Sequence, residues 1–456
     1  MSRILLISAN TCDMPYPVYP LGMATVAGAL IDAGHEVRQF DWLVANRDGC
    51  LLEQAIGAFG PDVVAVSIRN IDLIDSLAEF ADAWELKEAK DVVALVRRST
   101  DVPVIIGGPA VSTMPHEVCR YVSADMAVPG EGERSIVEAV AWCIAHWESL
   151  RPQSVWPAAH ERLCGQRQCS PRFDPALVSF YWDKSGIIGL QSKRGCPYHC
   201  CYCTYPELEG TTFRSRPIEA VVADLERLKR DFQVDTVFFV DSVFNDPQDQ
   251  YLQLAEALAV RDLRVKWAAY MSPRGLTKKA VRLCKRAGLY AAELGTDATT
   301  DITLEAMGKP FRWADVTQTN EMLVQAGIAC AHFVIFGGPQ ETPATVREGL
   351  DDIAGLEHCV VFGFSGIRIY PGAPLHRRAI AEHLLQETDS LFEPVYYVSP
   401  AVDKAWLERQ VVESWAGRQD RIFPPGRGQR AAAMLRAFGW KGLLWERMIH
   451  FPADVV

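Results

Sequence analysis

The sequence predicts an α/β protein with two parallel sheets in succession: a Rossmann-like, doubly wound sheet at the N-terminus, then a partial (β/α)6 TIM-type barrel, then a helical C-terminal tail. Short apolar runs alternate with amphipathic stretches in two series along the 456 residues, which is typical of parallel strands joined by crossover helices. A proline-rich interval divides the two series. Because 49% of the residues are apolar, the chain can bury two or three separate cores.

The first series covers residues 1–150 and predicts one doubly wound domain. Open parallel sheets bind ligands beyond the carboxyl ends of their strands, so we expect a ligand site at that edge. The expected helices are residues 21–33, 51–59 and 76–98. The expected strands are residues 3–8, 36–41, 62–67, 102–106 and 126–128.

The second series begins after an irregular interval. Four prolines interrupt residues 151–186, which we interpret as a linker. Six βα units then predict a barrel over residues 187–385, with reactive residues at the C-terminal ends of its strands. Residues 386–456 are expected to be helical and to pack over the barrel. The expected barrel strands are residues 187–191, 236–240, 266–270, 291–295, 331–336 and 364–370.

Composition restricts the partners and the compartment. The formal net charge is −11, which disfavours a non-specific DNA- or RNA-binding protein, because phosphate affinity depends on Lys and Arg. No apolar run reaches the roughly 18 residues of a membrane span, and the apolar run near the N-terminus is too short for a signal peptide. We therefore expect a cytoplasmic protein whose thirteen cysteines are metal ligands or buried thiols.

The strongest motif is a group of cysteines directly after the first predicted barrel strand. Cys196, Cys200 and Cys203 have CxxxCxxC spacing, so three thiolates on one tight loop can bind three irons of a [4Fe–4S] cluster and leave the fourth iron open. His199 in the same loop keeps a zinc site as an alternative, and buried thiols without a metal are another. Cys201 is not a ligand by its spacing.

This loop, its position and the βα units that follow it resemble the radical S-adenosylmethionine (radical SAM) superfamily. The resemblance implies that the cluster reductively cleaves S-adenosylmethionine. It also implies that Tyr202, the aromatic residue before the last cysteine, leans over the bound cofactor. Three later stretches, residues 293–297, 336–342 and 369–375, resemble the fourth, fifth and sixth strand ends of the same superfamily.

The N-terminal half resembles the cobalamin-binding domain that precedes the radical domain in one large subgroup. The DxHxxG stretch whose His binds cobalt in many such domains is absent, so cobalt would lack a protein imidazole. Cobalamin binding and a domain retained only for architecture are both open. The matching stretches are Tyr19-Pro20-Leu21-Gly22, Gly60-Pro61-Asp62 with Ser67, Gly107-Gly108-Pro109 and Gly130-Glu131-Gly132-Glu133.

Polar residues near the ends of the barrel strands are the remaining candidates. We expect Asp241, Glu293 and Tyr370 to act as catalytic acids or bases. Purely structural alternatives remain, such as a helix N-cap for Asp241 and a surface ion pair for Arg274. Besides Tyr202, the expected cofactor-binding residues are Ser242, Ser272, Arg274, Glu293, Gly337, Gly338 and Arg368.

Three functions follow from the resemblance. The missing cobalt ligand favours hydrogen abstraction from a small polar metabolite with dehydration or rearrangement, as for a sugar diol in aminoglycoside-type antibiotic biosynthesis. The alternative enzyme is a cobalamin-dependent radical SAM C-methyltransferase. A non-enzymatic iron–sulfur sensor or scaffold subunit is the third hypothesis. Because the cluster must be reduced, an electron donor such as flavodoxin or ferredoxin is implied.

Overall fold

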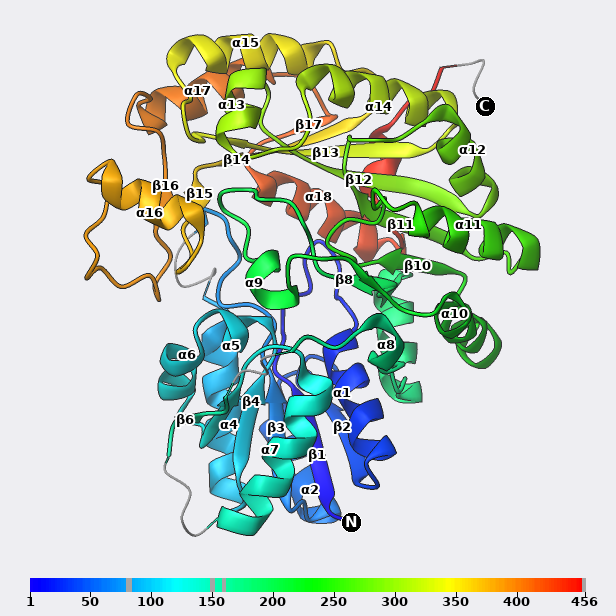
Figure 1. Ribbon diagram of the computed structural model, residues 1–456, viewed down its shortest axis with the longest axis vertical. Coiled ribbons are helices and arrows are strands. Elements are labelled where there is room, and N and C mark those ends of the chain that lie inside the picture. The colour runs from blue at the N-terminus through cyan, green and yellow to red at the C-terminus, as the bar shows by residue number, and fades with distance from the viewer. Residues whose placement is uncertain (79–83, 148–151, 158–160, 453–456) are drawn as a thin grey trace.

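The computed structural model describes residues 1–78, 84–147, 152–157 and 161–452. Two lobes are stacked along the long axis of the molecule, with the N-terminal sheet below and the barrel above (Figure 1). Among the described residues, no helix combines the length and the apolar character needed to cross a membrane.

The N-terminal sheet is parallel throughout, with the strand order β2-β1-β3-β4-β5-β6. Because successive side chains of a strand point to opposite faces, Ile4 and Leu6 of β1 enter one core while Leu5 and Ile7 enter another. The predicted doubly wound sheet is confirmed. Its strands are β1 (Arg3–Ser8), β2 (Glu36–Asp41), β3 (Val63–Ser67), β4 (Val104–Gly107), β5 (Met126–Val128) and β6 (Ser154–Val155).

Helices cover both faces of this sheet. The strand order reverses between β1 and β3, which makes a topological switch point there. The carboxyl ends of the strands point toward the barrel (Figure 1). One face carries α1 (Leu21–Asp32) and α7 (Gly132–His146), and the other carries α2 (Gly49–Phe59), α4 (Leu86–Ser99) and α6 (Pro115–Val122).

The upper lobe is an open barrel of parallel strands in the order β7-β10-β11-β12-β13-β14-β17. This confirms the predicted partial TIM-type barrel. Its strands are β7 (Ile188–Leu190), β10 (Thr236–Phe239), β11 (Lys266–Met271), β12 (Leu289–Asp297), β13 (Ala329–Phe336), β14 (Val360–Ser365) and β17 (Arg421–Ile422). Its outer helices are α10 (Ile218–Phe232), α11 (Gln250–Arg261), α12 (Lys278–Arg286), α14 (Trp313–Gln325) and α15 (Pro343–Ala354).

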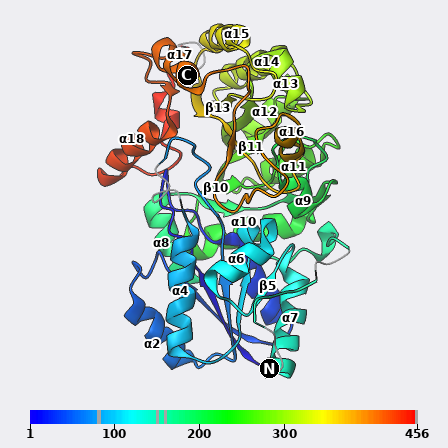
Figure 2. The same ribbon diagram turned by 90° about the vertical axis from the view of Figure 1, so that its left-hand side faces the viewer.

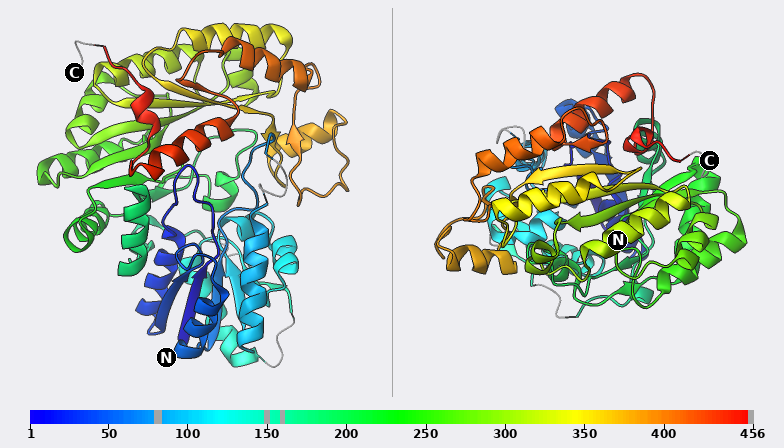
Figure 3. Two further views of the ribbon diagram at one scale, coloured as in Figure 1. Left: turned by 180° about the vertical axis from the view of Figure 1, so that it is seen from behind. Right: turned by 90° about the horizontal axis from the view of Figure 1, so that it is seen from above.

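Small side chains line the inside of the barrel and leave room for the C-terminal segment. Leu443 and Trp445 pack into this room, and Trp445 begins the short helix η3 (Trp445–Met448). Seen from behind, the red C-terminal segment crosses the barrel (Figure 3). The inward-facing alanines are Ala268, Ala291, Ala329 and Ala331.

Two predicted segments of the N-terminal half differ from the structure. The helix predicted over residues 76–98 begins only at Leu86, and residues 79–83 lie outside the described residues. The predicted linker, residues 151–186, contributes β6 to the N-terminal sheet and contains α8 (Pro175–Ser185). Asp174 caps α8 by accepting from the amides of Ala176 and Leu177, so a proline at the first helical position starts a helix here.

Two predictions for the C-terminal half also need correction. The sixth strand, predicted over residues 364–370, lies earlier: β14 ends at Ser365, because Gly366 at φ +74° turns the chain away. Ile367–Arg368 (β15) then pairs antiparallel with Tyr396–Tyr397 (β16). The tail is not wholly helical: it contains α17 (Lys404–Ser414) and α18 (Pro425–Ala437), but β17 between them extends the barrel sheet.

Buried polar contacts join the two lobes, which touch along their common edge (Figure 2). The Tyr181 hydroxyl of α8 donates to Asp41 at the end of β2, over 3.0 Å. Arg194, just before the cysteine loop, pairs with Glu133 of α7 at 2.7 Å. Both contacts begin at strand or helix ends, so the lobes are held at the edge where ligands of parallel sheets bind.

Candidate active site at the junction of the lobes

The cysteine loop lies at the C-terminal end of the first barrel strand. After β7 the chain forms β8 (Lys193–Arg194), the loop over residues 196–203 and then α9 (Tyr205–Glu209). The backbone of Cys201 anchors the loop: its N–H donates to Met307 O at 2.9 Å, and its carbonyl accepts from Leu375 N at 2.8 Å. The Cys201 side chain packs into the apolar core.

Two glycines allow this loop to approach its neighbours. Gly195 has φ +89°, and a Cβ there would lie 2.0 Å from Thr212 O. Gly308 has φ +73°, and a Cβ there would lie 2.4 Å from His199 O. Side chains fit at neither position, because both the backbone conformation and the space exclude them.

The three predicted ligand thiols influence one another electrostatically. Burial raises the pKa of each thiol, that of Cys203 to about 12, while the nearby ammonium of Lys309 acts in the opposite direction. Among the described residues, no three His, Cys, Asp or Glu side chains are close enough to share a single metal ion. Each thiolate of a [4Fe–4S] cluster binds a different iron, so that finding concerns single-ion sites and not a cluster.

A buried ion pair lies beside the cysteine loop. The Tyr202 hydroxyl donates to Asp297 Oδ2 at 2.6 Å, and Lys309 Nζ pairs with the same oxygen. The ammonium also lies 5.4 Å from the centre of the Phe311 ring. Although burial alone would lower it, the pKa of Lys309 is raised by Asp297 and by the thiol of Cys200. Lys309 is therefore a fixed cation next to Tyr202.

Asp241 and Ser242 follow β10 and support the cysteine loop. Asp241 is fully buried and accepts from the amides of Ser192 and Lys193 at 2.7 and 3.2 Å, with Lys193 Nζ at 3.6 Å. Ser242 Oγ donates to Gly195 O at 2.8 Å and contacts the Cys196 thiol. The partners of Asp241 all precede the loop, and its catalytic role stays a prediction.

Ser272 and Arg274 lie just beyond β11, on the same edge of the barrel. The Asn245 side chain holds both backbones: its Oδ1 accepts from Ser272 N at 2.8 Å, and its Nδ2 donates to Ser272 O and Arg274 O. Ser272 is buried, whereas Arg274 is exposed and faces Tyr198 of the cysteine loop. A cofactor at the loop would be within reach of Arg274.

Gly337 and Gly338 form the turn after β13. Gly337 has φ +88°, and both amides donate to the Glu341 carboxylate, the Gly338 bond measuring 2.9 Å. Burial raises the pKa of Glu341 to about 7, although these two amides lower it. A Cβ on Gly338 would lie 3.2 Å from Met307 Sδ. The turn thus packs against the segment that anchors the cysteine loop.

Arg368 joins the lobes. Its Nε pairs with Asp72 of the N-terminal lobe at 3.0 Å, and both side chains are buried. Its remaining nitrogens donate to Ile369 O and Leu391 O, and the guanidinium lies 4.9 Å from the Tyr370 ring. All nitrogens of the guanidinium therefore have protein partners, so the predicted cofactor contact of Arg368 is not favoured by its surroundings.

Glu293 lies deeper in the barrel than the other candidates. It precedes Asp297 by four residues on β12, which is roughly 13 Å along a strand. The indole N–H of Trp445 donates to Glu293 Oε1 at 3.1 Å. Burial raises the pKa of Glu293 to about 7, and the bond from Trp445 works against that rise. A carboxyl that titrates near neutrality is suited to proton transfer.

The switch point of the N-terminal sheet faces this site. The loop of residues 9–20 rises from β1 toward the barrel (Figure 1), and Arg69 follows β3. Arg69 influences Tyr16, Tyr205 and Tyr270 electrostatically. Buried Asn10 has no hydrogen-bond partner for its Oδ1 among the described residues. Polar groups of both lobes therefore meet where a parallel sheet binds its ligand.

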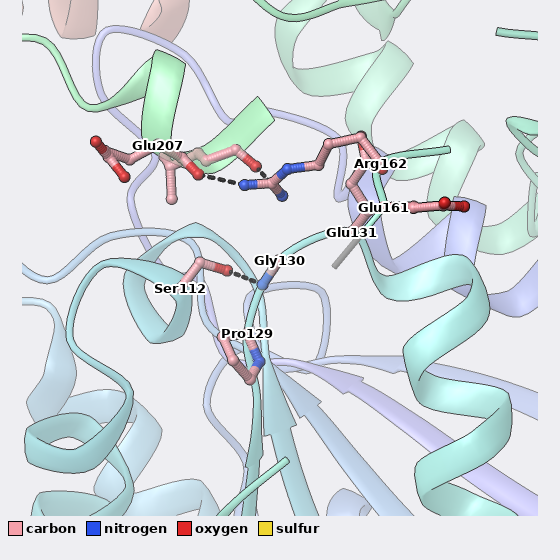
Figure 4. A pocket seen from close by; sticks show the side chains of 8 residues that line it. Ser112, Pro129, Gly130, Glu131, Glu161, Arg162 and Glu207 are labelled. Carbon is pink, nitrogen blue, oxygen red and sulfur yellow. Dashed lines mark hydrogen bonds between the residues drawn. The ribbon is translucent and has the colours of Figure 1, made fainter. Parts of the chain in front are cut away.

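A small cavity of about 110 Å³ opens at the same junction, between Ser112, Gly130, Arg162 and Glu207 (Figure 4). Gly130 N donates to Ser112 Oγ at 2.8 Å, and Arg162 donates to the carbonyls of Glu207 and Leu208 in α9. The cavity lies between the carboxyl end of β5 and α9, the helix after the cysteine loop. It is therefore lined by both lobes, beside the cysteine loop.

Sequence reasoning missed Lys309, Tyr16 and Trp445. Lys309 follows Gly308 at the end of α13 (Asp301–Ala306), where a glycine and a lysine are ordinarily a helix C-terminus. Tyr16 and Trp445 are far from the barrel strands in sequence. Only the spacing of Lys309 from Asp297, twelve residues, was a visible signal, and spacing alone does not indicate contact.

Two protein-family profiles match this chain, one in each lobe. The B12 binding domain profile matches residues 8–140, and the Radical SAM superfamily profile matches residues 190–353. The chain is 27% identical to a tryptophan 2-C-methyltransferase of Streptomyces laurentii, over 81% of this chain and 73% of that protein.

Solved structures share the whole fold. TsrM of Kitasatospora setae, a radical S-adenosylmethionine methyltransferase solved with tryptophan substrate and a SAM analogue, has a TM-score of 0.83 at 22% identity, covering 98% of this chain and 97% of that one. The cobalamin-dependent radical enzyme OxsB has a TM-score of 0.72 at 14% identity, covering 96% and 72%. The chain belongs to the radical SAM superfamily, in the subgroup with an N-terminal cobalamin-binding-like domain.

The residues present fit the cofactors of that subgroup. Three thiols on one loop that influence one another electrostatically are the donor set of a [4Fe–4S] cluster. The Asp297–Lys309 pair offers one charge of each sign for the amino-acid part of S-adenosylmethionine. The unpaired Asn10 oxygen at the switch point fits a ligand on this edge of the B12-binding-like domain, although the sequence lacks the DxHxxG stretch.

One prediction is wrong. The sequence favoured dehydration or rearrangement over methyl transfer because the cobalt-binding His is missing. Several relatives are named methyltransferases, among them proteins of Streptomyces laurentii and Streptomyces wedmorensis, and a relative from Methylococcus capsulatus is named a methylase. The inference failed because it treated an imidazole ligand as a requirement for methyl transfer.

Proposed function

We propose that this protein is a cobalamin-dependent radical SAM methyltransferase that acts on a small molecule. The observation that carries the proposal is the meeting of two ligand-binding edges. The cysteine loop lies at the C-terminal ends of the barrel strands, and the β1–β3 switch point lies at the C-terminal ends of the N-terminal strands. Arg69, which follows β3, influences Tyr205 and Tyr270 of the barrel lobe electrostatically. The methyltransferase names of relatives that match most of the chain support it.

In this proposal, Cys196, Cys200 and Cys203 hold the cluster. Lys309 binds the carboxylate of S-adenosylmethionine through a charge-assisted bond, and Asp297 binds its ammonium or ribose. Cobalamin occupies the switch-point edge. Bound together, these groups supply an activated methyl group, while the protein orients the reactants and excludes water. An electron donor such as flavodoxin or ferredoxin would be the redox partner of a protein that holds such a cluster.

Metal content tests the proposal first. The protein is purified without oxygen, with iron and hydroxocobalamin supplied, and iron and cobalt are counted per chain. We expect about four irons and about one cobalt. Changing Cys196, Cys200 and Cys203 to Ala should remove the iron and leave the cobalt. Zinc in place of iron, or no cobalt, would contradict the proposal.

Turnover is the second test. The loaded protein is incubated with S-adenosylmethionine, a reductant and L-tryptophan or indole, chosen because a relative acts on tryptophan. S-adenosylhomocysteine should form together with a product heavier by one methylene group. 5′-Deoxyadenosine without any methylated product would contradict methyl transfer.

A further inference from the structure

The barrel contains an inner space whose walls are aromatic. Tyr270 faces inward, paired in register with Glu293 on the next strand, and 41% of its surface is accessible. Burial nevertheless raises the pKa of its hydroxyl. Its ring packs on Phe238, which belongs to the apolar cluster inside the barrel together with Ala268, a residue of the same strand as Tyr270, so the accessible surface of Tyr270 faces the interior of the barrel.

Several rings surround that space. Phe238 packs against Tyr270 with ring centres 4.7 Å apart. Tyr16 enters from the loop after β1 and joins the apolar cluster inside the barrel. Phe333 and Phe362 stack 5.1 Å apart on the following strands. Such walls favour a flat ring, which can stack on them or meet them edge to face.

Two polar groups in this space are incompletely bonded. Trp445 donates to one oxygen of Glu293, and no hydrogen bond from the described residues reaches the other oxygen. The buried Tyr290 hydroxyl likewise has no partner among them. Because an unsatisfied buried polar group is costly, the Tyr290 hydroxyl indicates a ligand that forms a hydrogen bond with it. The second oxygen of Glu293 is open to accept a hydrogen bond from the same ligand.

The charges restrict that ligand further. The groups that face Glu293 are the hydroxyls of Tyr16, Tyr270 and Tyr290 and the indole of Trp445. Arg69 of the N-terminal lobe influences Tyr16 and Tyr270 electrostatically. Glu446 of η3 faces Tyr290. The positive Arg69 opposes a cationic ligand, so the aromatic walls do not form a cage for an ammonium group.

We infer that this inner space binds the methyl acceptor, a planar aromatic ring with an N–H or O–H donor, and that Glu293, held by Trp445, accepts the proton that the acceptor loses. This rests on the proposed function. Replacing a ring hydrogen by a methyl group forms one C–C bond, breaks one C–H bond and releases one proton. The methyl group leaves S-adenosylmethionine as a methyl cation equivalent, so no net oxidant is needed.

Trp445 is a positioning residue in this arrangement. Its indole N–H fixes one carboxylate oxygen, so the other oxygen points into the space. Trp445 belongs to the C-terminal segment that fills the barrel, so the same segment both closes the barrel and orients Glu293.

Equilibrium binding tests the inference without turnover. Indole and 1-methylindole, which lacks the N–H, are titrated into the protein carrying its cluster and cobalamin, without S-adenosylmethionine. Indole should bind about tenfold more tightly, as expected for a hydrogen bond to a charged group. Glu293→Gln should remove that preference. Equal binding of the two probes, a preference that survives Glu293→Gln, or no binding of indole would overturn the inference.

The pH dependence separates positioning from structure. Indole binding should strengthen as pH rises through about 7, where Glu293 loses its proton. Trp445→Phe removes a bond that lowers the pKa, so the midpoint should move to higher pH. Trp440→Phe is the matched control, since Trp440 is exposed and stacks on Arg447 at 4.0 Å; its midpoint should not move. An unchanged midpoint in Trp445→Phe would contradict the role of Trp445.

The two proposals can fail separately. A protein without cobalt that still prefers indole through Glu293 would refute the methyltransferase and keep the acceptor site. A protein that produces S-adenosylhomocysteine but shows no Glu293-dependent preference would keep the methyltransferase and refute the site.

Discussion

At Glu293, burial and one hydrogen bond act in opposite directions on the same carboxyl. Burial in the barrel prevails and raises its pKa to about 7, despite the donor from Trp445. The folded protein therefore holds a proton on Glu293 at pH values where the unfolded chain has released it. The stabilisation from that proton is fully present below about pH 4.5 and is lost as pH rises through about 7.

Glu293→Gln should accordingly become more stable relative to the unmodified protein as pH rises. Between pH 5 and pH 8 the difference in free energy of unfolding should shift toward the variant by up to about 3 kcal/mol. Urea unfolding at the two pH values measures it. Glu256→Gln, an exposed position on α11, is the control and should show no such shift.

The ion pair beside the cysteine loop gives a second prediction for single residues. Lys309→Met leaves Asp297 buried with only Tyr202 as a partner. We expect a loss of about 3 to 5 kcal/mol in the free energy of unfolding, because an uncompensated buried charge is costly. Lys309→Met with Asp297→Asn should regain much of it. If the double variant were no more stable than the single one, the pairing would not explain the loss.

At the scale of elements, the cysteine loop depends on a turn that is distant in sequence. Gly308 follows α13. Because glycine has no Cβ, the backbone of the cysteine loop can pass close to it at His199. The same close approach permits the bond between Cys201 N and Met307 O. Loop and turn are therefore one structural unit.

Gly308→Ala should displace the cysteine loop and reduce the bound iron to well under half of the normal content. Iron is counted after anaerobic purification. Gly275→Ala is a matched control: Gly275 has a similar φ of +78°, but nothing lies within 4 Å of a Cβ there. The control carries the backbone cost of about 1–2 kcal/mol without the clash, so it should keep its iron. Equal loss in both variants would refute the role of the contact.

On the scale of the whole molecule, the lobes are joined by buried pairs between distant residues. Arg368 and Asp72 are 296 residues apart and both fully buried. Asp41 and Tyr181 add a second contact, over 140 residues. Since the proposed site lies between the lobes, these pairs set the distance between the two cofactor-binding edges.

Arg368→Met should lower the free energy of unfolding by about 3 to 5 kcal/mol, because Asp72 would stay buried without its partner. Urea unfolding followed by tryptophan fluorescence measures it. Asp72→Asn combined with Arg368→Met should be more stable than Arg368→Met alone. A loss below about 1 kcal/mol, the range of surface pairs, would contradict the buried pairing.

The sequence by itself determined the features that depend on neighbouring residues. The strands and helices of both lobes follow from local periodicity, and the CxxxCxxC spacing lies within a single loop, so the superfamily could be identified from it. The β14 boundary was misplaced because apolar residues continue past Gly366, whose left-handed backbone ends the strand. Local patterns do not show such a break.

Only the tertiary structure decided which residues of distant segments meet. Lys309 reaches the cysteine loop through the fold, Tyr16 enters the barrel from the other lobe, and Trp445 returns from the C-terminal segment to hold Glu293. Arg368 pairs with Asp72 of the N-terminal lobe, a contact that no local pattern indicates, and its predicted cofactor contact stays a prediction. The sequence gives the charge of each side chain. The partner of that side chain depends on tertiary packing, which brings together residues that no local pattern connects.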